Sequence, residues 1–148
     1  RKTFISLLLL PCLFINIPAH AGQADTETNL RIEDAWIAEA PPVSKVMVAY
    51  MTLHNSGQQD MEIITASSDM YSSIEFHETV HENGMARMIR HNSLKIPAYS
   101  KIELKRGGAH LMLFNPVSPL KAGDTVTIKL ITSNNTEKTA TVAVKKLP

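Results

Sequence analysis

Apolar and polar positions alternate along most of the chain, with the period of two residues that is typical of β-strands with one buried face. The clearest example is residues 46–53, in which Met47, Ala49, Met51 and Leu53 share one face. Similar patterns occupy residues 30–39, 61–66, 74–80, 85–90, 101–105, 109–114, 125–131 and 139–145. Because no long segment has the 3.6-residue period of a helix, the sequence predicts an all-β protein.

Turn signals separate these segments roughly every ten residues, which is typical of a β-sandwich. They include the proline pair 41–42 and the Gly- or Asn-containing turns at 55–57, 83–84 and 133–135. Neither repeats nor low-complexity tracts divide the chain. We therefore predict a single β-sandwich domain over residues 30–148.

The Asn-Gly pair at 83–84 is the strongest short-range signal for a two-residue hairpin turn, because both residue types tolerate positive φ. The resulting register pairs Thr79 with Met88 and leaves His77 diagonal to Met88 on the same face. Met85 falls on the opposite face of this hairpin. The turn therefore predicts one His and one Met within reach of each other.

A second hairpin turn is predicted at the Gly-Gly pair 107–108. A two-residue turn there pairs Leu104 with Leu111 and Ile102 with Leu113, which gives one apolar face for the core. The intervening side chains of the second strand then point away from that core.

These outward side chains include His110 and Met112, so each predicted hairpin presents one His and one Met on a single face. The combined set is His77, Met88, His110 and Met112. Soft thioethers select Cu(I) and imidazole accepts it, whereas zinc sites favour thiolate, imidazole and carboxylate ligands. The set therefore indicates a site for one Cu(I) ion per chain.

Each of these residue types also has an ordinary structural role. A methionine in a β-sandwich is most often a core residue, which the alternating pattern indicates for Met47 and Met51. An isolated histidine such as His54, His81 or His91 is most often a surface residue. The alternative hypothesis is a metal-free β-sandwich of the cell envelope that binds only a protein partner, and the spacing leaves it open.

The first residues have the pattern of a secretory signal peptide. Residues 1–21 begin with two basic residues, continue with an apolar run at 4–17 and end in a small-x-small cleavage site. That run is short for a bilayer, Pro11 interrupts it and Pro18 follows it, so we expect no stable membrane insertion after cleavage. Cleavage after Ala21 leaves a polar segment, 22–29, that we expect to be a flexible leader.

Cleavage also changes the chemistry available to the chain. The only cysteine, Cys12, leaves with the signal peptide, so the mature protein has no thiolate for a blue-copper centre. Loss of two basic residues leaves 13 basic and 14 acidic side chains, a net charge of −1. This charge disfavours nucleic acid as a partner. The sequence contains no recognisable catalytic triad or phosphate loop, and we expect no enzymatic activity.

The spacing of the His and Met set resembles the signature of the periplasmic copper chaperones of the PCuAC type. Ten residues separate His77 from Met88, twenty-one separate Met88 from His110, and one separates His110 from Met112. The resemblance extends to EDAWIAEAPP at 33–42, AYMTLHNSG at 49–57, KRGGAHLML at 105–113 and PLKAGDTVTIKL at 119–130. It therefore covers nearly the whole mature chain.

This resemblance implies a cupredoxin-like Greek-key β-sandwich that binds one Cu(I) through His77, Met88, His110 and Met112. It also implies a periplasmic chaperone that delivers copper to an acceptor, such as the binuclear copper centre of cytochrome oxidase or another copper chaperone. We expect a monomer. Some relatives add a copper site in a His- and Met-rich tail, but this chain has no His or Met after Met112.

Overall fold

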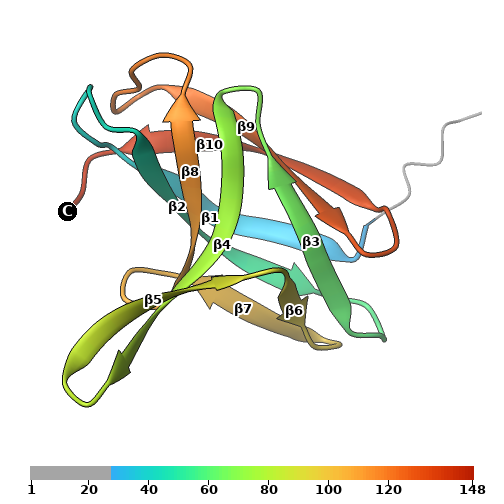
Figure 1. Ribbon diagram of the computed structural model, residues 1–148. Helices are drawn as coiled ribbons and strands as arrows, with labels where there is room; N and C mark the ends of the chain where they lie inside the picture. Colours follow the sequence, from blue (N-terminus) through green and yellow to red (C-terminus); the bar gives the residue numbers. More distant parts are fainter. Residues whose placement is uncertain (1–27) are drawn as a thin grey trace, which may run out of the picture.

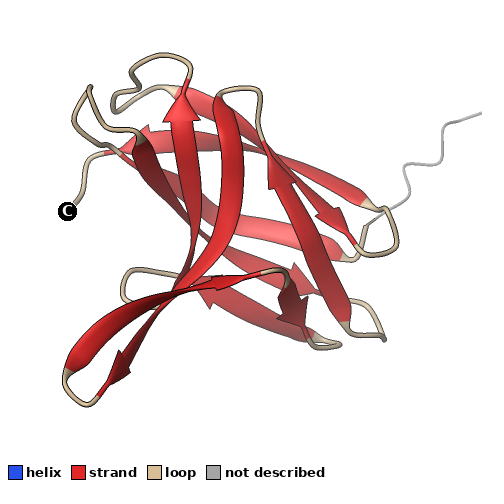
Figure 2. Cartoon of the chain, in the orientation of Figure 1, coloured by secondary structure: helices blue, strands red, loops and turns tan. Residues whose placement is uncertain are grey.

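Ten strands make up most of residues 28–148, the part of the chain that the computed structural model describes (Figures 1 and 2). They are β1 (Leu30–Ala38), β2 (Val46–Asn55), β3 (Met61–Ser67), β4 (Tyr71–Glu82), β5 (Met85–His91), β6 (Leu94–Ile96), β7 (Ser100–Leu104), β8 (Ala109–Pro116), β9 (Thr125–Thr132) and β10 (Glu137–Lys145). Loops join them, and this part of the chain contains no helix (Figure 2). The all-β prediction is confirmed.

The predicted signal peptide, residues 1–21, lies outside the described residues, as does most of the predicted leader. Its last two residues, Thr28 and Asn29, are described, and the carbonyl of Asn29 accepts a hydrogen bond from the backbone N–H of Ser56 at 2.9 Å. Between residues 28 and 148 there is no helix of the length and apolarity needed to cross a membrane.

The strands form one continuous hydrogen-bonded sheet in the order β5-β4-β8-β2-β1-β10-β9-β3-β6, and β7 pairs with β2 beside this path. The sheet folds over on itself, so that β4 and β8 lie in front of β1, β9 and β10 (Figure 1). Strand β8 lies between β4 and β2, and β10 lies between β1 and β9. Sheet neighbours are therefore often distant in sequence, as in Greek-key sandwiches, and the predicted fold class is confirmed.

The hydrophobic core lies between the two layers and follows the predicted alternation. Met47, Ala49, Met51 and Leu53 of β2 are all buried, whereas their sequence neighbours are only partly so. Leu111 and Leu113 of β8 are completely buried as well. The further core side chains include Leu30, Ile37, Ile63, Phe76, Ile96, Ile128, Leu130, Val142 and Val144.

The β4–β5 hairpin has the register that the sequence predicts. Thr79 lies opposite Met88, and Glu82 lies opposite Met85. Asn83 and Gly84 have φ angles of 51° and 76°, the left-handed values that a type I′ turn requires at both central positions. The hairpin projects from the body of the sandwich (Figure 1).

The second predicted hairpin is wrong. Leu104 of β7 lies opposite Met51 of β2, and Leu111 of β8 lies opposite Ala49 of the same strand. Both β7 and β8 are antiparallel to β2, so they run in the same direction instead of pairing with each other. Residues 105–108 form a loop between them, closed by a hydrogen bond from Lys105 N–H to the Ala109 carbonyl. The loop with the two glycines therefore separates two strands that both pair with β2, and it does not reverse the direction of the chain.

Two local features were absent from the predicted strand pattern. Strand β6 is only three residues long, too short to show an alternation, although Leu94 and Ile96 are buried against β3. Strand β1 contains a β-bulge between Glu33 and Trp36, where Asp34 has a φ of 51°. The bulge lets Glu33 and Trp36 both take places in the ladder with β2.

Candidate metal centre

The pairing of β4 with β8 places His77 directly opposite His110. Their ring centroids are 6.2 Å apart, and the ring planes are inclined by 29°. His110 is 5% exposed, and the side chain of His77 is 14% exposed. Although the predicted hairpin at 107–108 is wrong, His110 still points away from the core, because alternation along β8 alone decides its face. The imidazole pair therefore lies on the outer face of the β5-β4-β8 layer.

The two methionines of the predicted set flank this pair. Met112 follows His110 on the same face and lies opposite Glu75 of β4. Met88 of β5 lies opposite Thr79, diagonal to His77, and is 51% exposed. Their partners on β4 are four residues apart, or roughly 13 Å along an extended strand. The structure thus brings the imidazoles together and places one thioether on either side of them.

Hydrogen bonds orient both imidazoles. Nδ1 of His110 lies 2.9 Å from the backbone carbonyl oxygen of Gly108. The same carbonyl accepts a hydrogen bond from the N–H of Thr79 at 3.1 Å, which joins the loop to β4. Because a carbonyl only accepts hydrogen bonds, Nδ1 of His110 carries a proton, and in the neutral imidazole Nε2 then has the lone pair. A lone pair on an imidazole nitrogen is what a metal ion requires.

His77 is held by a residue outside the predicted set. Its Nε2 lies 2.8 Å from Oε2 of Glu75, while its Nδ1 is buried and has no hydrogen-bond partner within residues 28–148. The other carboxylate oxygen of Glu75 lies 3.5 Å from Nη1 of Arg90. Phe114 borders the site, with its ring centroid 6.4 Å from that of His77. Glu75 precedes His77 by two residues, so the period of two was the signal that could have found it.

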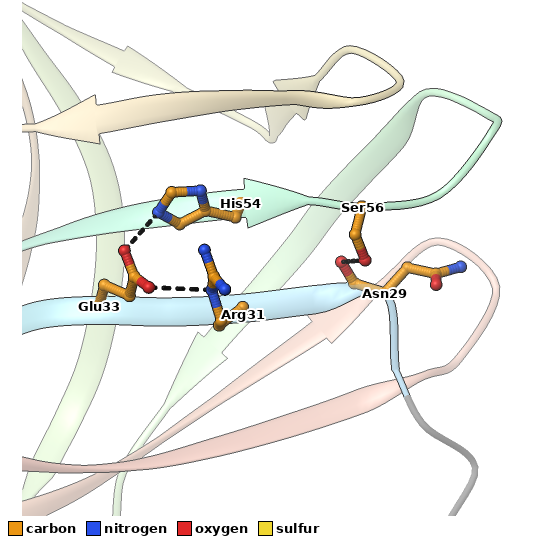
Figure 3. Close-up of polar contacts among 5 residues, drawn as sticks. All are labelled: Asn29, Arg31, Glu33, His54 and Ser56. Atoms are coloured by element: carbon orange, nitrogen blue, oxygen red, sulfur yellow. Dashed lines mark hydrogen bonds and ion pairs between the residues drawn. The ribbon is translucent and has the colours of Figure 1, made fainter.

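The remaining histidines have structural partners or lie at the surface. Nε2 of His54 is 2.7 Å from Oε2 of Glu33, whose other oxygen is 3.0 Å from Nε of Arg31 (Figure 3). Nε2 of His91 is 2.8 Å from Oε2 of Glu78, on the face of the β4–β5 hairpin opposite His77. His81 is exposed near the tip of that hairpin.

Three methionines outside the set lie where the sequence predicts. Met47 and Met51 are core residues, and Met85 is 71% exposed on the face opposite Met88. Across the described part of the chain, no group of three or more His, Cys, Asp and Glu side chains could hold a metal ion. The side chains of Met88 and Met112 lie on the same face of the sheet as His77 and His110. Thioether and imidazole together suit Cu(I) better than zinc.

Comparisons with known proteins find sequence relatives that are named lipoproteins and similar solved structures that hold copper. Residues 30–144 match the family described as "Putative lipoprotein LpqE-like". "Putative lipoprotein Lxx21020" of Leifsonia xyli subsp. xyli is 30% identical to this chain, over 98% of this chain and 89% of its own length.

Two solved structures are similar over most of the described domain. The solution structure of Cu(I)-bound DR1885 from Deinococcus radiodurans is 33% identical, covers 86% of this chain and 82% of its own, and has a TM-score of 0.58. The copper-bound PCuAC domain from PmoF2 is 21% identical, covers 80% of this chain and 94% of its own, and has a TM-score of 0.67. At 21% identity, the similarity to the PmoF2 domain is evidence for the fold alone.

Proposed function

The chain belongs to the LpqE-like family, and on that premise we propose that it is a Cu(I)-binding chaperone of the cell envelope. The ligands that we propose are His77, Met88, His110 and Met112. The ion is cargo that is bound and released unchanged, so the function involves no catalysis. The expected absence of enzymatic activity is part of this proposal.

One observation carries the proposal. His77 and His110, from separate parts of the sequence, lie opposite each other on the face of the sheet that points away from the core, flanked by Met112 and Met88. Imidazole and thioether are neutral ligands, and neither has a thiol proton to lose. Neither can form a disulfide in an oxidising compartment. Such a set suits a monovalent ion that must later be released.

The comparisons support copper as the ion. DR1885, which is 33% identical, has been solved with Cu(I) bound, and the PmoF2 domain shares the fold with copper bound. We propose one Cu(I) per chain, because the described domain holds a single set of this kind. The lipoprotein names of the family and of its Leifsonia member support an envelope location, and periplasmic residence after removal of residues 1–21 is our proposal.

We propose delivery to a protein acceptor, such as the binuclear copper centre of cytochrome oxidase or another copper chaperone. The exposure of Met88 supports direct exchange, because an incoming Cys or His ligand reaches that thioether without unfolding the site. His110, which is almost fully buried, would then release the ion last.

The test is a Cu(I) titration of the purified protein under reducing conditions, against a colorimetric Cu(I) chelator. Saturation at one equivalent is expected. A double variant, His77→Ala with His110→Ala, should lose tight binding. Saturation at two tight equivalents would contradict the single-site proposal.

The matched control is a double variant of His54→Ala with His91→Ala. These imidazoles face Glu33 and Glu78 instead of each other, so one equivalent should still bind. If wild-type protein purified from copper-fed cells contains no metal and binds none in the titration, the metal-free protein-binding module is the better interpretation.

A further inference from the structure

We infer that Glu75 is a positioning residue that determines which nitrogen of His77 faces the copper ion. This inference rests on the proposed function, but its first observable belongs to the metal-free protein. It assigns the ligand atom as Nδ1 of His77, the ring nitrogen nearer the backbone. For His110, the ligand atom is the farther nitrogen, Nε2.

The first step concerns the proton between His77 and Glu75. Nε2 of His77 and Oε2 of Glu75 are 2.8 Å apart, which is hydrogen-bond distance. An ionised carboxylate only accepts hydrogen bonds, so Nε2 must carry the proton. In a neutral imidazole the lone pair then resides on Nδ1.

The second step concerns the environment of Nδ1. This atom is buried, and no hydrogen-bond partner reaches it from any described residue. A buried polar atom without a partner costs free energy and calls for an explanation. Metal binding explains the missing partner of Nδ1. A nitrogen that is to bind a metal ion must have a free lone pair, so it has no hydrogen-bond donor beside it in the metal-free protein.

The third step concerns what holds Glu75 itself. Arg90 lies opposite His77 on β5, and its guanidinium is 3.5 Å from the carboxylate oxygen that His77 does not use. The side chain of Glu75 is 24% exposed, whereas that of Arg90 is 64% exposed. Arg90 therefore orients the carboxylate from the solvent side, and Glu75 orients the imidazole beneath it. Carboxylates that hold a metal-ligating histidine in this way are a common device of metal sites.

The chain contains a matched control. Glu78 and His91 form a second Glu–His pair on the same hairpin, also with 2.8 Å between Oε2 and Nε2. That pair lies on the other face, and the side chain of His91 is 38% exposed. The two pairs have the same chemistry, and only Glu75 borders the candidate centre.

The experiment uses protein with ¹⁵N-labelled histidine and records the imidazole nitrogen shifts by NMR, first without metal at a pH where imidazole is neutral. In wild type, His77 should show one tautomer, with the proton on Nε2. Glu75→Ala should allow both tautomers, and Glu75→Gln should restore the single tautomer, because the amide oxygen still accepts. A proton on Nδ1 of wild-type His77 would overturn the inference.

Addition of Cu(I) gives the second readout. In wild type, the large shift change should occur at Nδ1 of His77 and at Nε2 of His110. Glu75→Ala should weaken Cu(I) binding about 10- to 100-fold, the usual effect of losing such a partner. Glu78→Ala should leave binding within about twofold, and urea unfolding of both variants checks that they fold.

The outcomes separate the two proposals. If wild type binds no Cu(I), the proposed function fails, whichever nitrogen carries the proton. If wild type binds Cu(I) but Glu75→Ala and Glu78→Ala bind it equally, only the role of Glu75 is refuted. Coordination of Cu(I) through Nε2 of His77 would also refute that role while leaving the proposed function intact.

Discussion

The two thioethers of the candidate centre differ in their surroundings. Met88 is half-exposed on the outer strand β5, whereas Met112 lies on β8 with strands on both sides. Thioethers bind soft ions without titrating, so each contributes affinity that depends on position and not on pH. Position is therefore the property that separates Met88 from Met85, which is even more exposed on the opposite face of the hairpin.

Replacement of Met88 tests this difference. Met88→Ala should weaken Cu(I) binding by about tenfold or more, which corresponds to about 1.4 kcal/mol, because one ligand is lost. Met85→Ala should change the affinity by less than about twofold, since its side chain points away from His77. The measurement is competition with a Cu(I) chelator. A larger effect of Met85→Ala would mean that another register exists in solution.

The burial of Tyr71 leads to a prediction about alkaline pH. Burial raises the pKa of its phenol to about 12, from an ordinary value of 10.0. The folded state therefore holds the phenol proton more tightly than the unfolded state does. This stabilisation is complete below pH 10 and is lost as the pH rises through 12. At pH 11 the loss should be about 1.4 kcal/mol of unfolding free energy.

Tyr71→Phe should abolish this part of the alkaline loss. The variant removes the phenol and its 3.4 Å contact with the sulfur of Met47 but keeps the ring in the core. Urea unfolding at pH 8 and pH 11 measures the difference. Tyr99→Phe is the control, because Tyr99 is 70% exposed. Equal alkaline losses in wild type and Tyr71→Phe would refute the prediction.

Among the elements, the loop 105–108 connects fold and site. It joins β7 to β8 along the edge of β2, and its last carbonyl, that of Gly108, holds both Thr79 and His110. Gly107 has a φ of 76°, which side chains disfavour, whereas Gly108 is outside the left-handed region. The two glycines thus have different functions in one short loop.

Alanine substitutions should reveal this difference. Gly107→Ala should lower the free energy of unfolding by about 1–2 kcal/mol, the cost of a left-handed L-residue. Gly108→Ala should be nearly neutral, because its added Cβ would lie 3.7 Å from Lys105, an ordinary contact. Urea unfolding of the two variants measures both effects. A costly Gly108→Ala beside a neutral Gly107→Ala would contradict this account of the loop.

For the whole molecule, the candidate centre and the core are the two faces of the same strands. Leu111 is fully buried, and its sequence neighbours His110 and Met112 lie on the opposite face of β8. The described domain contains no cysteine, so packing must supply the stability that disulfides give many exported proteins. Stability and copper binding should therefore be separable at adjacent positions.

Leu111→Ala and Met112→Ala test this separation. Leu111→Ala should lower the free energy of unfolding by about 2–5 kcal/mol through the cavity that it leaves. Its folded fraction should still bind Cu(I). Met112→Ala should weaken Cu(I) binding by about tenfold and cost less stability than Leu111→Ala. Unfolding curves and chelator competition measure the two effects, and a variant that loses both equally would contradict the separation.

The sequence by itself determined the features that depend on near neighbours. The period of two placed Leu111 inside and His110 outside, because alternation is a property of any extended strand. The Asn-Gly turn set the register of β4 against β5, because a two-residue turn leaves the flanking strands only one pairing. Both results depend on residues of a single strand or a single hairpin.

Only the tertiary structure decided what remote strands bring together. The Gly-Gly pair at 107–108 did not form a hairpin, because β2 offers pairing to both β7 and β8 and thereby fixes their common direction. The contact of His77 with His110 and the burial of its Nδ1 arise from the pairing of β4 with β8. No local pattern encodes that pairing, because the hydrogen bonds of a sheet are made between backbone groups that are alike in every residue except proline.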